Sequence, residues 1–442
     1  MRPASTTTPL LPGAIPVAGH LVPFLRDPLA FVRGLRDHGP LVRLRLGPRT
    51  VWVVTTPELA RRVYVTDQNL FDKGGPLFDK VRLYLGNGLV TCSGAEHPRQ
   101  RALVQPAFHR DRLRAYTDIA ANAVTEITGT WRPGQVVRLD TEVHRFAATV
   151  TARSLITAPA GLRAAAEAAR VTMEIFNGLF WQMIMPGEAF AKLPLPVNRR
   201  YRHRVARVRA LVDEVIDLYR DGPDHGDLLS TLVRAHDDTP DGRRQIHDQV
   251  ITFITAGVET AAHGMVWTLR LLDAHPDVAD RVRAELRDTL GDRPPGHDDL
   301  ASLPCTRAAA TEALRLRPPG WLITRTAPHD VHWDDLHIPA GADVLVSPYA
   351  LHHDPTAFPD PDRFDPDRWL PPRLTSAQRE AYFAFGAGRR KCIGDTMGLD
   401  ATTVLLAELV GRRRLHHLSD TTHDRGRPRL NLIPPPTPVR VD

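Results

Sequence analysis

The pattern of hydrophobic and polar positions predicts a mainly helical protein with a small sheet near its start. Residues 41–54 alternate apolar and basic side chains, turn at Gly47–Pro48 and continue through three valines, which is typical of a β-hairpin. Residues 97–317 show mostly helical spacing, with Pro and Gly between the segments. The longest predicted helix spans about 246–274, where apolar residues such as Val250, Ile254 and Val258 recur on one face.

After the helical region the pattern changes. Short strands are predicted around Val331–Trp333 and Asp343–Val346, an irregular stretch rich in Asp and Pro follows at 353–372, and a helix follows residue 392. No repeat of fixed period is present in the sequence. We therefore expect one α-rich domain over residues 1–442, with small peripheral sheets and a proline-rich N-terminal segment at 1–25.

Composition and charge narrow the class of protein. The 442 residues are 42% hydrophobic and 24% charged, as in soluble globular proteins. The net charge is +6, but no basic run alternates with aromatic residues, so we predict no nucleic-acid binding. Prolines interrupt the apolar stretch Pro9–Leu25, and no run approaches the roughly 20 apolar residues of a membrane span. The three cysteines lie far apart, which predicts no disulfide framework and favours the cytoplasm.

One cysteine lies in a distinctive loop. Residues 385–394 place Phe, Gly, Arg, Cys and Gly in the order FxxGxRxCxG, with Cys392 just before an apolar-periodic run. The positive end of a helix dipole and the adjacent basic side chains would stabilise a thiolate there. Glycines at 386, 388 and 394 would let the backbone turn tightly and approach a flat ligand. The alternative is a buried structural cysteine beside a surface arginine cluster.

The loop resembles the heme-binding signature of the cytochrome P-450 family. This resemblance implies a helical fold in which heme b is buried between the long central helix and the cysteine-loop helix, with Cys392 as the axial iron ligand. It also implies a set of contacts to the macrocycle and its propionates, in which His97 stands where many members have Trp. The expected cofactor-binding residues are His97, Arg101, Arg325, Phe385, Gly386, Arg390, Cys392 and Gly394.

Ala256-Gly-Val-Glu-Thr260, in the long helix, resembles the family's AGxET motif for oxygen activation. Gly257 would allow the helix to open beside Ala256, and the Thr260 hydroxyl could bond either to a carbonyl or to dioxygen and water. The resemblance implies that Thr260 and Glu259 deliver protons during O–O cleavage. Taken alone, such a string is more often a polar break in a core helix, but its occurrence beside the cysteine loop favours the oxygen-activation role.

Two further segments resemble structural elements of the family. Glu312 and Arg315 match its ExxR pair, and Pro361-Asp-Arg363-Phe364 matches its PxRF element. The resemblance implies that Glu312, Arg315 and Arg363 form a buried triad that braces the cysteine loop. Such a network would be structural and not catalytic.

The segments that line the substrate pocket in this family are apolar and aromatic here, with no obvious anchor for a charged group, which favours a neutral, compact substrate. Ordinary core packing would give the same pattern. The candidate pocket residues are Phe71, Phe78, Phe176, Phe180, Phe253, Trp321, Leu322 and Ile433. Stretches such as 338–355 and 364–371 resemble bacterial enzymes that oxidise sesquiterpenes such as pentalenene or epi-isozizaene, so we expect a terpenoid substrate in secondary metabolism.

The resemblance implies a monomeric monooxygenase that inserts one oxygen atom of O₂ into a C–H bond. Electrons would come from NAD(P)H through a ferredoxin reductase and a ferredoxin, which could dock on a basic face formed by Arg110, Arg112, Arg114, Arg389 and Lys391. The alternatives are a fatty-acid or polyketide hydroxylase, a peroxygenase that uses H₂O₂, and a non-catalytic heme-binding relative. The Glu259–Thr260 pair argues against the last two.

Overall fold

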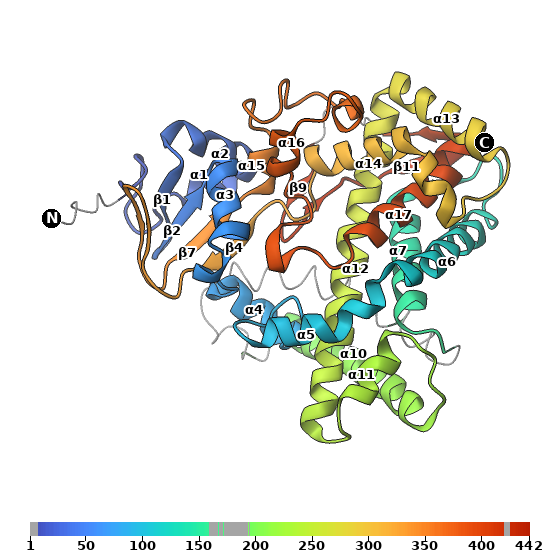
Figure 1. Cartoon of the computed structure of the whole chain (residues 1–442), viewed down its shortest axis with the longest axis horizontal. Helices are drawn as coiled ribbons and strands as arrows, with labels where there is room; N and C mark the ends of the chain where they lie inside the picture. The colour runs from blue at the N-terminus through green and yellow to red at the C-terminus, as the bar shows by residue number, and fades with distance from the viewer. Residues whose placement is uncertain (1–7, 159–166, 168–170, 172–192, 194, 420–424) are drawn as a thin grey trace. The chain divides into compact units, whose positions relative to one another are not determined.

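The computed structural model describes residues 8–158, 167, 171, 193, 195–419 and 425–442. Figure 1 shows a mainly helical chain with small sheets, which confirms the predicted fold class. Its contacts divide the chain into two compact units. The sheet unit comprises Met1–Asp79, Thr311–Cys392 and Leu430–Ile433, and the helical unit comprises Lys80–Ala310, Ile393–Arg429 and Pro434–Asp442.

A four-stranded sheet organises the sheet unit, in the order β1 (Leu41–Leu46), β2 (Arg49–Val54), β7 (Asp343–Val346) and β4 (Ile323–Thr326). The predicted hairpin is present: β1 and β2 are antiparallel, with Leu44 opposite Val51, and Gly47 supplies the positive φ of 62° that the turn needs. Strand β7 is parallel to β2 and antiparallel to β4. A second hairpin pairs β5 (Val331–Trp333) with β6 (Leu336–Ile338).

Short helices surround these strands. They are α1 (Leu21–Arg26), α2 (Pro28–Gly34), α3 (Pro57–Arg61), α15 (Pro348–His352) and α16 (Ser376–Ala381), with single turns η1 (Leu35–His38), η2 (Arg62–Thr66), η3 (Gln68–Leu70), η6 (Pro366–Trp369) and η7 (Gly388–Arg390), and the short strand β10 (Leu432–Ile433). A core of large buried side chains, including Trp52, Tyr64, Trp333 and Phe383, fills the space beneath the sheet. Helices α4 (Gly75–Leu85) and α14 (Pro304–Leu316) run across the boundaries of the unit.

The helical unit contains most of the long helices. They are α5 (Glu96–Val104), α6 (Arg110–Thr128), α7 (Leu139–Leu155), α10 (Pro196–Asp221), α11 (Leu228–Ala235), α12 (Pro240–Ala274), α13 (Pro276–Leu290) and α17 (Asp395–Leu406), with the turns η4 (Gln105–Phe108), η5 (His297–Ser302) and η8 (Ala407–Gly411). A three-stranded sheet in this unit has the order β3 (Val136–Arg138), β11 (Pro438–Val441) and β8 (Leu415–His417). The unit also contains the short strand β9 (Arg427–Pro428).

Helix α12 is the long helix that the apolar periodicity predicts, and it packs against α7, α10 and α17 (Figure 1). It starts at Pro240, earlier than the expected 246, because its first turns are polar and carry no apolar repeat. The start is specified locally: Thr239 caps the helix by accepting a hydrogen bond from the Gly242 amide, and proline suits the first helical position. In the described ranges, none of the helices combines the length and the apolar character needed to cross a bilayer.

Candidate functional site

The cysteine loop closes through short backbone hydrogen bonds. The amide of Cys392 donates to the carbonyl of Phe385 at 2.8 Å, and the amide of Gly386 donates to the carbonyl of Phe383 at 2.9 Å. The Cys392 side chain is exposed, and helix α17 begins shortly after it, at Asp395. The thiol is therefore presented from a tight turn just ahead of a helix N-terminus, where the partial positive charge of the helix favours a thiolate.

The loop is also held to the neighbouring turns η2 and η3. A Cβ atom added at Gly388 would lie only 1.8 Å from the carbonyl oxygen of Tyr64, so only glycine fits there. Next to it, the Arg389 amide donates to Oε1 of Gln68 at 2.8 Å, and its guanidinium donates to Oδ1 of Asn69 at 2.7 Å. The glycine therefore permits a close approach of two backbones that fixes the loop in place.

Two arginines of the sheet unit are candidates to bind an anion. Arg390 pairs with Asp72 at 2.6 Å and is mostly buried. Arg325 is buried, donates to the carbonyl of Thr324 at 2.8 Å and stacks over the Tyr64 ring, and no carboxylate in the described ranges forms an ion pair with it. Burial lowers the pKa of Arg325. A buried cation without a counter-ion is costly, which suits a site that receives an acidic group.

A second feature of the sheet unit is a buried network centred on Glu312. Both Arg315 and Glu312 have no exposed side-chain surface, and two hydrogen bonds of 2.8 Å join them, as expected for the ExxR pair. The third partner is not the predicted Arg363, whose residue is exposed and contributes only its carbonyl oxygen to Arg315. Arg368 takes that place instead: its buried Nε donates to Glu312 at 3.2 Å, beside the indole of Trp369 at 2.9 Å.

The correction has a local cause. Pro366-Asp-Arg368-Trp369 repeats the pattern of Pro361-Asp-Arg363-Phe364, namely proline, aspartate, arginine and an aromatic residue. In the structure the second copy forms the turn η6, which directs its arginine and tryptophan toward Glu312. The repeated pattern in the sequence could have identified Arg368 as a candidate. Which of the two arginines pairs with Glu312 is decided by tertiary packing.

The AGxET segment lies in the middle of α12, in the helical unit. Thr260 is exposed, and its hydroxyl donates to the carbonyl oxygen of Ala256 at 2.6 Å, one of the two alternatives expected for it. A Cβ atom at Gly257 would lie 3.1 Å from Thr151 of α7, so the glycine marks a close approach of the two helices. The helix continues through this point as regular α-helix.

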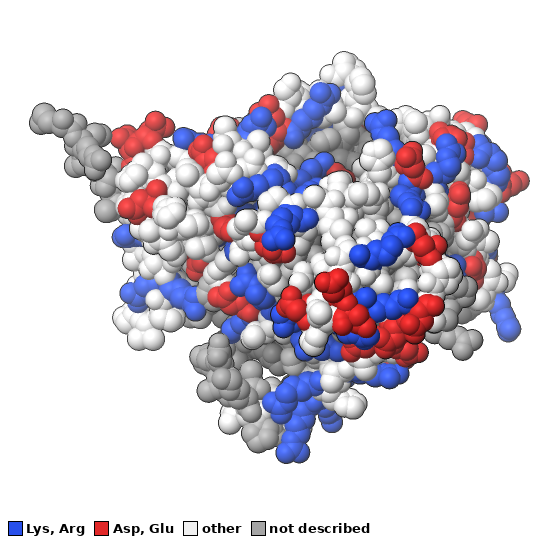
Figure 2. Space-filling model, turned by 60° about the horizontal axis from the view of Figure 1, so that its bottom comes forward, with Lys and Arg blue, Asp and Glu red and all other residues white. Residues whose placement is uncertain are grey.

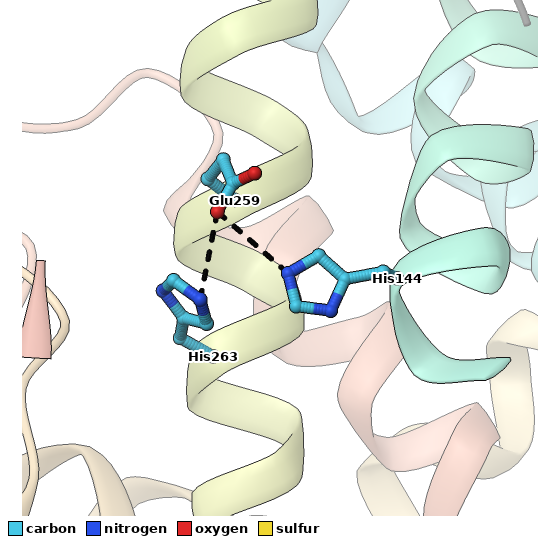
Figure 3. Close-up of side chains that lie close together, drawn as sticks. All are labelled: His144, Glu259 and His263. Carbon is cyan, nitrogen blue, oxygen red and sulfur yellow. Dashed lines mark ion pairs between the residues drawn. The ribbon is translucent and has the colours of Figure 1, made fainter. Parts of the chain in front are cut away.

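Glu259 is buried and lies between two histidines that sequence reasoning did not identify (Figure 3). Its Oε2 is 3.7 Å from Nε2 of His144, on α7, and 3.5 Å from Nε2 of His263, one turn further along α12. Burial favours the neutral form of His144, but the Glu259 carboxylate outweighs this effect and raises its pKa. Burial lowers the pKa of His263 to about 4, so this ring is neutral at pH 7. The i,i+4 spacing of Glu259 and His263 was visible in the sequence, whereas the position of His144 was not.

The comparisons with known proteins identify the family. The Cytochrome P-450 family model matches residues 9–441. The chain belongs to the cytochrome P-450 family. This P-450 is 41% identical over 430 residues to cyclooctatin synthase of Streptomyces melanosporofaciens, covering 96% of this chain and 93% of that protein. It is 39% identical over 409 residues to pentalenene oxygenase of Streptomyces avermitilis, covering 91% and 90%. Its structure resembles the heme domain of cytochrome P-450DA, with a TM-score of 0.84, 26% identity and coverage of 99% and 98%.

Membership makes this P-450 a monooxygenase with a heme-thiolate cofactor. The sheet unit fits that cofactor on its own evidence. It offers an exposed thiol on a glycine turn and, in Arg325, a buried cation that lacks a carboxylate partner among the described residues. The two further propionate candidates, His97 and Arg101, lie on α5, where His97 is buried and Arg101 is half-buried.

The expected pocket residues fall into several environments. Phe71 is buried in the core of the sheet unit against Trp333, and Trp321 is buried with its ring stacked on Phe24. In the helical unit, Phe253 is buried against Phe108. Phe78, Leu322 and Ile433 are half-buried, whereas Phe176 and Phe180 lie outside the described residues. Phe71 therefore has the contacts of a core residue. That the predicted residues line a substrate pocket stays a prediction.

The expected basic docking residues are partly engaged within the protein. Arg114 makes two hydrogen bonds with Asp298, at 2.7 and 2.8 Å, and Arg112 donates to the carbonyl of Gly226. Arg389 holds the cysteine loop, and all five residues are exposed. Basic and acidic side chains are intermixed over the face shown in Figure 2.

Proposed function

We propose that this P-450 oxygenates a neutral terpenoid. The observation that carries the proposal is its identity of about 40%, over nine-tenths or more of both chains, with proteins named cyclooctatin synthase and pentalenene oxygenase. The apolar and aromatic character of the expected pocket segments supports it, because a charged substrate would need a buried polar partner.

In this proposal the residues that hold the cofactor and the residues that deliver protons have separate roles. Bound heme supplies the iron at which dioxygen is cleaved. The Cys392 thiolate would hold the iron, and electron donation from the sulfur would favour the cleavage of dioxygen. Arg325 and Arg390 of the sheet unit would bind the propionates of the cofactor, and the same kind of contact is expected of His97 and Arg101.

Proton delivery is assigned to the α12 motif. The Thr260 hydroxyl donates its own hydrogen to the Ala256 carbonyl, so its oxygen keeps lone pairs that can accept a hydrogen bond from a water molecule. The Glu259 carboxyl can hold a proton and release it toward that water. Electrons come from NAD(P)H through a reductase and a ferredoxin, for which exposed basic residues such as Arg110 provide complementary charge.

The proposal is tested with purified, heme-loaded protein. The reduced, CO-bound sample should give the thiolate-type Soret band, and Cys392→Ser should abolish it while Cys92→Ser, at a fully buried cysteine, should keep it. Titration with pentalenene-type terpene hydrocarbons should then shift the heme spin state, and turnover with a surrogate ferredoxin system under ¹⁸O₂ should give a product carrying one labelled oxygen. Binding and oxidation of fatty acids, with no response to any terpene, would overturn the proposed substrate class.

A further inference from the structure

The Glu259–His144–His263 cluster has a geometry that a set of simple hydrogen bonds does not explain. One possible ligand atom from each of Glu259, His144 and His263 lies within 4.8 Å of the other two (Figure 3). The two oxygen–nitrogen distances are 3.5 and 3.7 Å. Charge-assisted hydrogen bonds between a histidine and a carboxylate normally close to about 2.7–2.9 Å. The cluster is therefore more open than a proton shared between these groups would leave it.

These separations match the edges of a metal coordination shell. Nitrogen and oxygen ligands bind zinc at about 2.0–2.2 Å, so two ligands of a tetrahedral zinc ion lie about 3.4 Å apart. Two histidines and one glutamate form a common ligand set for zinc, with a fourth position left for water. Glu259 and His263 are one helical turn apart on α12, and His144 reaches them from α7, so the packing of two helices brings the three atoms together.

The surroundings of His144 orient its ring for such a role. Its Nδ1 lies 2.7 Å from the carbonyl oxygen of Asp140, and because a carbonyl can only accept, Nδ1 carries the hydrogen. In the neutral ring, Nε2 then directs a lone pair at the Glu259 carboxylate, and either a proton on Nε2 or a metal cation between the two atoms stabilises this arrangement. Histidines that bind metals are commonly oriented by such a bond from the other ring nitrogen to a backbone carbonyl.

The surroundings of His263 and the partial exposure of the cluster are also compatible with metal binding. The His263 side chain is 4% exposed, and its buried Nδ1 has no hydrogen-bond partner in the part of the chain that the structure describes. The side chains of His144 and Glu259 are 12% and 10% exposed, so the cluster is buried without being sealed. We propose that His144, Glu259 and His263 form a binding site for a divalent transition metal ion of the zinc class.

The site would act on the reaction through Glu259. A zinc ion that holds this carboxylate prevents it from carrying protons, so occupancy should lower product yield. This consequence rests on the proposed role of Glu259, whereas the metal site itself does not. Zinc binding with an unchanged product yield would support the metal site and contradict the proton role.

Equilibrium dialysis of the heme-loaded protein tests the site directly. After removal of metals with EDTA, the protein is dialysed against zinc chloride, and bound zinc is measured by mass spectrometry. A competition with a chromophoric chelator gives the affinity. His144→Gln and His263→Gln should each weaken binding about tenfold or more. His337→Gln, in the more exposed Asp330–His332–His337 cluster, is the matched control and should leave this binding unchanged.

Folding is checked by the CO-bound spectrum and by the melting temperature. If His144→Gln does not fold, Glu259→Gln and His263→Gln decide the question, since each removes one ligand. Zinc should also raise the melting temperature of the wild-type protein and not that of a folded ligand variant. Equal zinc affinity in the wild type, His263→Gln and Glu259→Gln, or loss of binding in His337→Gln alone, would overturn the proposal.

Discussion

The backbone amide of Phe383 donates a hydrogen bond of 2.8 Å to Nε2 of His352. The other ring nitrogen of this fully buried histidine lies 2.9 Å from the carbonyl oxygen of Arg315, so Nδ1 carries the hydrogen. Burial lowers the pKa of His352 to about 3, which keeps the ring neutral at pH 7. One imidazole thus connects the end of α14 to the chain that enters the cysteine loop.

Replacement of His352 should loosen that loop. His352→Ala leaves the Phe383 amide and the Arg315 carbonyl buried without a partner, at a cost of about 2–4 kcal/mol in the free energy of unfolding. Urea unfolding measures the loss, and the CO-bound spectrum should show a smaller thiolate-type fraction. His332→Ala, at an exposed histidine, is the control. An unchanged midpoint and spectrum in His352→Ala would refute the connection.

The two arginines of the duplicated pattern should behave differently. Arg368→Ala removes a buried partner of Glu312 and should destabilise the protein by about 3–5 kcal/mol, the usual cost of breaking a buried ion pair. Arg363→Ala should change stability by no more than about 0.5 kcal/mol, because its side chain is exposed. Chemical denaturation of both variants measures this contrast. The assignment fails if Arg363→Ala has the larger effect.

The glycines of the cysteine loop offer a second matched pair. Both Gly386 and Gly388 have a positive φ, 67° and 64°, so alanine is strained at either position. At Gly388 the new Cβ would also collide with the Tyr64 carbonyl, whereas at Gly386 the nearest atom is 4.0 Å away. Gly388→Ala should therefore lose most bound heme, and Gly386→Ala should keep most of it at a cost of about 1 kcal/mol. The ratio of heme absorbance to protein, compared between the two variants, decides the point.

Thr260→Ala should uncouple NAD(P)H consumption from product formation. The variant keeps the fold, because the exposed hydroxyl bonds only within its own helix. With a surrogate reductase and ferredoxin, NAD(P)H consumption should continue while product falls roughly tenfold or more. Thr260→Ser retains a hydroxyl and should restore most of the product. Equal yields per NAD(P)H in the wild type and Thr260→Ala would show that this hydroxyl carries no proton.

Asp227 should make the free energy of unfolding depend on pH in the acidic range. It caps α11 and accepts hydrogen bonds from Tyr219 at 2.6 Å, from Thr157 at 2.8 Å and from the Ser230 amide at 2.8 Å. Burial alone would raise its pKa, but these donors favour the charged form and lower the pKa below the ordinary 3.8. The folded state therefore gains stability from Asp227 that is fully present above the unfolded pKa and is lost as pH falls through the folded one.

The test compares urea unfolding of the wild type and Asp227→Asn between about pH 7 and pH 3. Asp227→Asn should cost about 2–3 kcal/mol at neutral pH, because an amide cannot accept all of these hydrogen bonds. The difference between the two proteins should shrink as the pH falls toward the acid end. A difference that stays constant over this range would mean that the carboxylate charge is not the cause.

Local sequence patterns predicted much of this P-450. The β1–β2 hairpin, the long helix α12 and the strands β5 and β7 all lie where alternation, helical periodicity and turn glycines place them. These features depend on residues that are close together in the chain. The sequence alone is therefore enough to predict them. The same is true of the Cys392 loop, because its glycines, basic residues and following helix are adjacent in the chain.

The secondary-structure elements, the cysteine loop and the family could therefore be inferred from the order of the residues. Tertiary structure alone decided that Arg368 and not Arg363 pairs with Glu312, that Phe71 packs in a core, and that His144 faces Glu259. The physical reason is the same in each case. Hydrogen bonds and burial depend on which segments meet in space, and distant segments with equivalent local patterns are distinguished only when packing selects one of them.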